Sequence, residues 1–209
     1  MDRQVEEYIY DHLDRESSVL NELYRYTHLN VPYSEMVSGH IQGRLLSMLS
    51  HMAKPVQILE IGAFTGYSAI CLAEGLSEDG HLHTIELDDE RAEVAAAFFE
   101  KAGLTNRITL HIGDALNIIP KLDIVFDLVF IDAAKKQYMD YYHAVFDKVK
   151  PGGYILVDNI LWYDQVADPK VQNETTNELR SFNEFIHNDV RVEKAIVQTR
   201  DGLFILKKK

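Results

Sequence analysis

Three oxygen-bearing side chains follow two short apolar runs in the second half of the chain. Asp132 ends the run Phe126–Asp132, Asp158 ends the run Tyr154–Asp158, and Asn159 comes next. The carboxyl ends of parallel strands meet at one edge of a sheet, so these groups are expected to converge. With no Cys or His nearby, they predict a hard cation, Mg²⁺ first with Mn²⁺ or Ca²⁺ behind it, and not zinc.

Adjacent residues of a strand point to opposite faces. Asp158 and Asn159 can therefore both bind a cation only if the strand ends and the chain bends between them. The alternative is that this pair forms a polar turn with no ligand.

A lysine stands three residues after the first of these carboxylates. If a helix begins there, Lys135 lies one turn beyond Asp132 and its amine can reach the same site. A lysine beside a divalent cation has a depressed pKa and can act as a general base. The sequence therefore predicts a catalytic pair of Lys135 and Asp132, with an ordinary surface lysine as the alternative.

A second group of candidate residues leaves the first apolar run, Val56–Ile61, in the sequence Glu60-Ile-Gly62-Ala-Phe-Thr-Gly66-Tyr67-Ser68. Its two glycines allow backbone to approach a ligand closely, but the third glycine of a dinucleotide fingerprint and the lysine of a P-loop are absent. The Glu60 carboxylate would repel a pyrophosphate and suits a ligand that carries an ammonium group. Tyr67 and Ser68 complete this candidate cofactor turn.

Acidic residues also lie at the ends of the next two apolar runs. Glu86, about 25 residues past the glycine turn, can accept hydrogen bonds from both hydroxyls of a ribose. Gly113, Asp114 and Ala115 follow the third run and can bracket an adenine. Each acid has a structural alternative, a solvated strand end for Glu86 and a helix N-cap for Asp114. Together they indicate a nucleoside without phosphates.

Trp162 and Tyr163 follow the proposed cation loop and can wall an aromatic acceptor by stacking on its ring, with core or interface packing as the alternative. The histidines form no zinc-binding pattern, and no serine lies in a GxSxG turn. The sequence therefore does not offer the nucleophile that a hydrolase would need.

The elements that position these residues alternate between strand and helix. Strands buried on both faces are expected at 56–61, 82–86, 108–112, 126–132 and 154–158. Helical patterns lie between them at 67–76, 90–102, 115–119 and 137–149, with Pro151-Gly152-Gly153 among the residues that punctuate their ends. This succession predicts a doubly wound, Rossmann-like α/β sheet. After one more helix, the runs 192–197 and 203–207 predict a hairpin that adds an antiparallel strand.

The first part of the chain has helical periodicity in three stripes, and Val31-Pro32 separates the second from the third. We expect one domain over 1–209, with an N-terminal helical cap (1–52) and an α/β core (53–209).

The amino-acid composition limits the classes of partner that the protein is expected to bind. A formal net charge of −12 weakly repels nucleic acid and favours cationic or neutral ligands. No apolar stretch approaches the roughly 20 residues that span a bilayer, and Met1 is not followed by a secretory signal. We therefore expect a cytoplasmic protein with no membrane partner.

The glycine turn, the sequence Ile131-Asp132-Ala-Ala-Lys135 and the sequence Val157-Asp158-Asn159 occur in this order. In this combination the chain, from about Val37 onward, resembles the caffeoyl-CoA and catechol O-methyltransferase family, especially its small bacterial members. The resemblance implies an S-adenosylmethionine-dependent, cation-dependent O-methyltransferase. It implies cofactor contacts at Val37 (through its backbone), Ser68, Glu86, Asp114, Ala115 and Asp132. It also implies that Asp132, Asp158 and Asn159 are the cation ligands and that Lys135 is the base.

The resemblance also implies a homodimer, with the N-terminal helices near the acceptor entrance. Tyr163-Asp164 stands where bacterial relatives often have a small residue and glycine, and the coenzyme A-binding insertion of plant enzymes is not recognisable. These two departures leave the acceptor open: we expect a small catechol-like or phenolic hydroxyl, and the alternative is a 5-hydroxyuridine in the tRNA anticodon. Two further alternatives remain. The first is a nicotinamide dehydrogenase, which is disfavoured by Glu60. The second is a non-catalytic nucleoside- or tRNA-binding module, which is disfavoured by the presence of Lys135 and of all three cation ligands.

Overall fold

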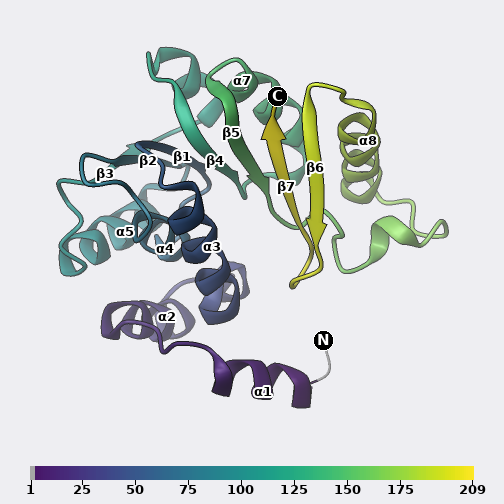
Figure 1. Cartoon of the computed structure of the whole chain (residues 1–209). Helices are drawn as coiled ribbons and strands as arrows, with labels where there is room; N and C mark the ends of the chain where they lie inside the picture. Colours follow the sequence, from purple (N-terminus) through teal and green to yellow (C-terminus); the bar gives the residue numbers. More distant parts are fainter. Residues whose placement is uncertain (1–2) are drawn as a thin grey trace.

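A seven-stranded sheet forms the centre of the computed structural model, which describes residues 3–209 (Figure 1). The strands are β1 Gln57–Ile61, β2 His81–Glu86, β3 Ile108–Ile112, β4 Phe126–Ile131, β5 Val149–Val157, β6 Val192–Val197 and β7 Leu203–Lys208. Their order is β3-β2-β1-β4-β5-β7-β6. The pairings from β3 to β5 are parallel, whereas β7 is antiparallel to β5 and β6. The predicted mostly parallel sheet with an antiparallel strand near the C-terminus is confirmed.

Helices lie on both faces of this sheet. They are α1 Arg3–His12, α2 Ser18–Asn30, α3 Gly39–Ala53, α4 Tyr67–Ala73, α5 Asp89–Lys101, α6 Ala115–Ile118, α7 Tyr138–Phe146 and α8 Glu174–Asn188. Short 3-10 turns lie at η1 Ser34–Met36, η2 Ile119–Lys121, η3 Lys135–Gln137 and η4 Gln165–Ala167. Within residues 3–209, none of the helices has the length and apolar character needed to cross a membrane.

The core divides into two apolar layers because the central strands are buried on both sides. In β1, Ile58 belongs to an apolar cluster that includes residues of α2, α3, α4 and α5, and its neighbour Leu59 belongs to one that includes residues of α6, α7 and α8. Both side chains are 0% exposed. Near-continuous apolar strands are what a sheet covered by helices on both faces requires.

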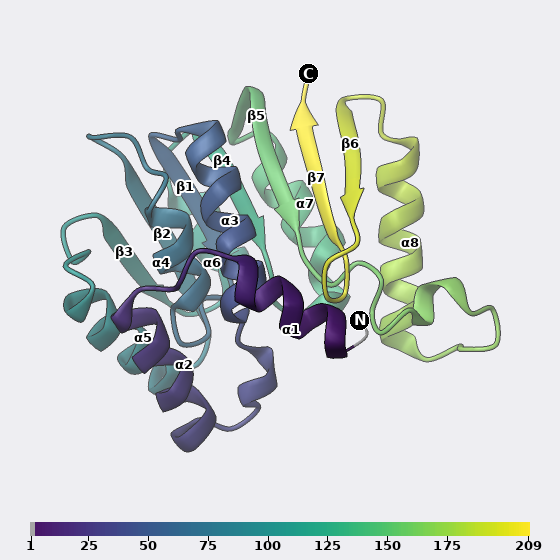
Figure 2. The ribbon, with the colours of Figure 1, turned by 60° about the horizontal axis from the view of Figure 1, so that its bottom comes forward.

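The carboxyl ends of the parallel strands face the side of the molecule where α1 and α2 lie (Figures 1 and 2). The helix α2 begins at the N-cap Ser17, whose side chain accepts a hydrogen bond from the Leu20 amide, and ends before the extended residue Val31. Val31 precedes Pro32, which disfavours helical backbone at Val31, so the predicted break between the second and third helices is confirmed.

Several predicted boundaries are wrong, and two of them lie around Pro151. We expected a helix to extend to residue 149, with Pro151-Gly152-Gly153 after it, but α7 ends at Phe146 and β5 already begins at Val149. The register between β4 and β5 shifts here, since Phe126 pairs with Val149 and Leu128 with Tyr154. A bulge of this kind tolerates proline, because the missing N–H is not needed for a regular ladder.

A histidine cluster on β2 and β3 predicts how stability depends on pH. Nδ1 of His83 lies 3.0 Å from Nε2 of His111, and the His81 ring lies beside His83. Burial, followed by the charges of His81 and His111, lowers the pKa of His83 from 6.5 to about 4. Between these two pH values the unfolded chain binds a proton that the folded chain does not, so the free energy of unfolding decreases as the pH falls.

On going from neutral to acid pH, the free energy of unfolding should therefore decrease by about 1 kcal/mol less in His83→Gln than in the wild type. This value is smaller than the pKa shift alone would give, because solvent partly screens a half-buried ring. Urea unfolding at pH values from neutral to acid measures it. The exposed His187 provides the matched variant, His187→Gln, which should keep the wild-type slope. Equal slopes for both variants would contradict the assignment to His83.

Candidate active site

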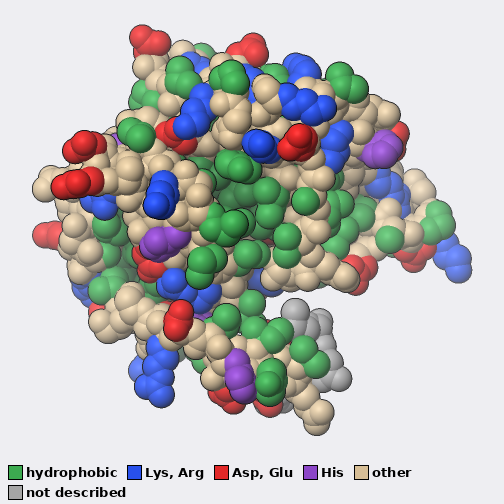
Figure 3. All heavy atoms as spheres, in the orientation of Figure 1, with side chains coloured by type: hydrophobic (Ala, Val, Ile, Leu, Met, Phe, Trp, Pro, Cys, Tyr) green, Lys and Arg blue, Asp and Glu red, His purple; other side chains and the backbone are tan. Residues whose placement is uncertain are grey.

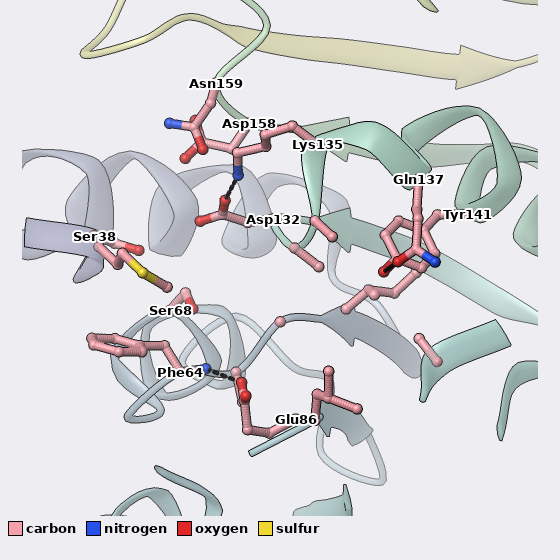
Figure 4. Close-up of a pocket in the computed structure, with 18 of the residues that line it drawn as sticks. Ser38, Phe64, Ser68, Glu86, Asp132, Lys135, Gln137, Tyr141, Asp158 and Asn159 are labelled. Atoms are coloured by element: carbon pink, nitrogen blue, oxygen red, sulfur yellow. Dashed lines mark hydrogen bonds and ion pairs between the residues drawn. The ribbon is translucent and has the colours of Figure 1, made fainter. Parts of the chain in front are cut away.

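A cavity of about 940 Å³ opens at the carboxyl ends of the parallel strands. It lies between the glycine turn after β1 and the segments that follow β4 and β5, and Figure 4 shows side chains from these segments directed toward it. The structure brings nearly all of the predicted site residues to its wall. They are Val37, Gly62, Tyr67, Ser68, Glu86, Gly113, Asp114, Ala115, Asp132, Lys135, Asp158, Asn159, Trp162 and Tyr163.

Glu60 is the predicted site residue that does not line this cavity. Its side chain is 0% exposed, with Oε2 accepting a 2.5 Å hydrogen bond from the Thr84 hydroxyl. Burial raises the pKa of Glu60 to about 7, although hydrogen bonds from Ser68 and Thr84 lower it in part. Because Ser68 is itself on the wall, Glu60 is placed to act on the cavity through Ser68.

The glycine turn is tight because it packs against the backbone of the neighbouring strand end. Gly62 has a φ of +99°, and a Cβ there would lie 2.1 Å from the carbonyl oxygen of Asp132. At Gly66, with a φ of +92°, a Cβ would meet the Phe99 ring at 2.7 Å. The sequence attributed these glycines to close approach of a ligand. The structure shows that Gly62 also seats the turn directly beside the end of β4, and that Gly66 seats it against α5.

This contact predicts a large effect for Gly62→Ala. The variant should lose about 2–4 kcal/mol of folding free energy, because it combines unfavourable positive φ with a steric overlap against backbone that cannot move aside. Gly103→Ala is the control, since Gly103 also has a positive φ, +69°, but no atom lies within 4 Å of its Cβ position. We expect the control to lose only about 1 kcal/mol in the same chemical denaturation experiment. Similar losses in the two variants would show that the contact with Asp132 is unimportant.

The two acids predicted to hold a nucleoside are both partly engaged by the backbone. Glu86 Oε2 accepts from the Phe64 amide at 2.7 Å, and Oε1 accepts from the Asp88 amide at 3.1 Å. Asp114 is the N-cap of α6, with its side chain accepting from the Leu116 amide at 2.8 Å. The helix N-cap alternative for Asp114 therefore describes its local role. Each carboxylate oxygen can accept a second hydrogen bond, so a ligand is still accommodated.

Asp132 and Lys135 form an ion pair on the cavity wall, with Nζ 2.6 Å from Oδ1 (Figure 4). Lys135 begins the 3-10 turn η3, three residues after Asp132, which directly follows β4. Burial alone would lower the pKa of Lys135, but Asp132 and Tyr138 raise it by more, to well above the ordinary lysine value. The neighbouring side chains therefore do not produce the lowered pKa that we expected for Lys135. Lys135 can accept a proton only in its neutral form, which requires that the ion pair with Asp132 be broken and that the ammonium first release a proton.

The chain bends after β5 as the cation hypothesis demands. The strand ends at Val157, and Asn159 has a φ of +56°, so Asp158 and Asn159 both reach the cavity. Asp158 is 2% exposed and its Oδ1 is buried without a hydrogen-bond partner among the described residues. Burial, and then the charge of Asp132, raise the pKa of Asp158 to about 7.

Two neighbouring carboxylates with a free buried oxygen fit a divalent cation, which would compensate their mutual repulsion. Within residues 3–209, no three His, Cys, Asp or Glu side chains are grouped to hold a metal. Asp132, Asp158 and the Asn159 amide would therefore need further oxygen ligands from outside the chain. This composition suits a hard cation that keeps open coordination positions, and it does not suit a closed structural site.

The aromatic pair lies at the mouth of the cavity. Trp162 is half-buried and Tyr163 is 66% exposed, and their ring centroids are 5.3 Å apart. Both residues have a positive φ, 48° and 54°, as does Asp164 with 60°. Strained backbone of this kind is found at binding sites, where the surrounding structure holds it.

Sequence reasoning missed several residues that shape the site. Arg91 lies over the Phe64 ring at 5.2 Å and lines the cavity. Gln42 donates a hydrogen bond to Asp158, and Arg200 contacts Gln42 from the loop between β6 and β7. Gln42 lies outside the apolar stripe of its helix, and nothing in the local sequence distinguishes it from a surface residue.

Comparison with known proteins agrees with this arrangement. The O-methyltransferase family model matches residues 10–209. A caffeoyl-CoA O-methyltransferase of Stellaria longipes is 32% identical, covering 96% of this chain and 88% of that protein. A catechol O-methyltransferase of Niastella koreensis is 33% identical, covering 75% and 73%. The O-methyltransferase TomG of Streptomyces achromogenes, solved in complex with SAM, has a TM-score of 0.91 at 31% identity and covers 100% and 99%.

These relatives share both the sequence and the fold of the chain over most of its length, which decides against the nicotinamide dehydrogenase alternative. The chain therefore belongs to the O-methyltransferase family that includes the caffeoyl-CoA and catechol O-methyltransferases.

Proposed function

We propose that the enzyme transfers the methyl group of S-adenosylmethionine to a hydroxyl of a small catechol-like or phenolic acceptor with the help of a divalent cation. The observation that carries this proposal is the convergence of the glycine turn with Asp132, Lys135, Asp158 and Asn159 on one cavity. The TomG structure, which holds SAM in the same fold, supports the choice of methyl donor.

On the donor side of the cavity, each part of S-adenosylmethionine meets groups of suitable polarity. Glu86 would accept hydrogen bonds from the ribose, and Asp114 and Ala115, which also line the cavity, would border the adenine. Val37, Tyr67 and Ser68 also line the cavity and would enclose the amino acid part, Val37 through its backbone. The anionic set of Asp132, Glu86 and Asp114 favours a ligand that carries a positive sulfonium.

Asp132, Asp158 and Asn159 would hold the divalent cation. When bound, it supplies Lewis acidity that lowers the pKa of an acceptor hydroxyl. Lys135 Nζ would take the hydroxyl proton only in its neutral form, after it has separated from Asp132 Oδ1 and released its own proton to solvent. The acceptor oxygen then forms a bond to the methyl carbon as the carbon–sulfur bond breaks, and the donor leaves as the thioether S-adenosylhomocysteine. The chain contributes placement of the two reactants and charge complementarity.

Trp162 and Tyr163 wall the open side of the cavity, where a planar acceptor can stack. A small phenolic acceptor suits this entrance better than tRNA, because the formal net charge of the chain is −12 and phosphates are repelled.

A radiolabelled methyl-transfer assay tests the proposal. With labelled S-adenosylmethionine and Mg²⁺, we expect transfer to catechol-type acceptors, little transfer to total tRNA, and loss of transfer after chelation by EDTA. Restoration by added Mg²⁺ or Mn²⁺ completes the expected pattern. Transfer to tRNA alone would instead establish the wobble-uridine alternative. A protein that binds S-adenosylmethionine in calorimetry but methylates neither substrate class would favour a binding module.

We also propose the homodimer. Hydrophobic side chains gather on the molecular surface over α3 and the β5–β7–β6 part of the sheet (Figure 3). Met48 and Met52 on α3 are 54% and 75% exposed, and Ile196 on β6 is 54% exposed. An exposed apolar patch of this kind is typical of a protein interface. Sedimentation velocity should give about twice the chain mass, and Met52→Glu should shift it toward the monomer.

A further inference from the structure

A chain of hydrogen bonds links the β6–β7 loop to the buried carboxylate of Asp158. Gln42, on α3, is 1% exposed, and its Nε2 donates to Asp158 Oδ2 at 2.7 Å. Nη1 of Arg200 donates to Gln42 Oε1 at 3.2 Å. Three segments far apart in the sequence therefore meet at one amide group.

The orientation of this amide is determined by the chemistry of its two neighbours. A guanidinium can only donate hydrogen bonds, and an ionised carboxylate can only accept them. The Gln42 oxygen must therefore face Arg200, and its NH₂ group must face Asp158. If Arg200 were absent, the amide could rotate and turn its oxygen toward the carboxylate, which would be repulsive.

The two oxygens of Asp158 have different environments as a result. Oδ2 is held by Gln42, whereas Oδ1 is buried without a hydrogen-bond partner among the described residues. The backbone is anchored as well, since the Tyr138 hydroxyl donates to the Asp158 carbonyl at 2.9 Å. The carboxylate is thus fixed through one oxygen and has the other available.

Arg200 also holds the segment that precedes α3. It donates to the carbonyl oxygens of Val37, at 2.8 Å, and Ser38, and Nη2 donates to that of Glu35 at 3.2 Å. Val37 lines the donor side of the cavity, so one side chain contacts both halves of the site.

We propose that Gln42, oriented by Arg200, is a positioning residue that fixes Oδ2 of Asp158 and so presents Oδ1 to the divalent cation. This inference rests on the proposed function. A hydrogen bond to a metal-ligating carboxylate orients it, and losing such a partner typically weakens metal binding by about 10–100-fold.

The test is a titration of the full-length protein with Mn²⁺, followed by electron paramagnetic resonance of the free ion. Gln42→Met keeps the length of the side chain and removes both hydrogen bonds, and we expect its Kd for Mn²⁺ to rise by about 10-fold or more. Ser50→Ala is the matched control. It removes another buried hydrogen bond of α3, from Ser50 to the Leu72 carbonyl at 2.6 Å, and should lower Tm without changing the Kd.

Arg200→Met provides a second variant, because Arg200 lies at a loop where substitution is less damaging to folding than in α3. It should weaken Mn²⁺ binding in the same direction but by less, since Gln42 is still present. If both variants fold and bind Mn²⁺ as tightly as the wild type, the positioning role is wrong while the proposed function stands. If the wild type itself binds no Mn²⁺, the proposed cation site fails and this inference fails with it.

Discussion

Replacing Asp158 with asparagine should lower methyl transfer on the order of a thousandfold, because Lewis-acid stabilisation by a divalent cation contributes several kcal/mol and each 1.4 kcal/mol is a factor of ten in rate. The side chain is nearly isosteric and can still accept the hydrogen bond from Gln42. The lost charge is therefore the main change. Single-turnover methyl transfer and Mn²⁺ affinity, measured on the same preparation, should fall together.

Stability should respond in the opposite sense to activity. Asp158 is buried beside Asp132, its Oδ1 lacks a hydrogen-bond partner among the described residues, and its raised pKa reflects this cost. Removing its charge should leave Tm, measured with EDTA, at or above that of the wild type, as is common where a site is strained for function. Asp189→Asn is the control. Asp189 is also buried but is paired with Arg191 and Tyr142, away from the cavity, so this variant should lose stability and keep Mn²⁺ affinity. If Asp189→Asn lost Mn²⁺ affinity and Asp158→Asn kept it, the cation would bind elsewhere.

Replacing Lys135 with methionine should lower kcat by about 10²–10⁴-fold, the usual contribution of a general base. The KM for S-adenosylmethionine should change little, because Lys135 acts on the acceptor proton. The pH dependence of kcat is the sharper readout. The rise in rate that accompanies deprotonation of the base should disappear in the variant, so that the remaining rate follows the ionisation of the acceptor alone.

Lys136→Met is the comparison variant for this experiment. Lys136 is the next residue, but its ammonium is half-exposed and pairs with Glu174, whereas that of Lys135 pairs with Asp132. We expect Lys136→Met to keep kcat close to the wild-type value. Lys135→Met should also lower the free energy of unfolding by about 1–3 kcal/mol, since it leaves Asp132 without its partner. The kcat of both variants should therefore be measured well below their Tm. Equal kcat losses in the two variants would rule out a specific role for Lys135.

The sequence by itself determined the sheet and the edge on which the chemistry lies. Short apolar runs separated by helical patterns predict a parallel sheet, and the ends of its parallel strands all lie along one edge. Glu86, Asp132 and Asp158 each end such a run, so their convergence followed from the pattern alone. The closing hairpin followed from Asp201-Gly202 between two apolar runs.

The tertiary structure alone decided how these residues are supported. Burial of Glu60 behind Ser68, the contact of Gly62 with the Asp132 carbonyl, and the pairing that raises the pKa of Lys135 all depend on neighbours distant in sequence. Gln42 lies 116 positions from Asp158, and no local periodicity records such a contact. The physical reason is that hydrogen bonds and desolvation depend on distances in space, whereas sequence patterns report only which face of an element is apolar.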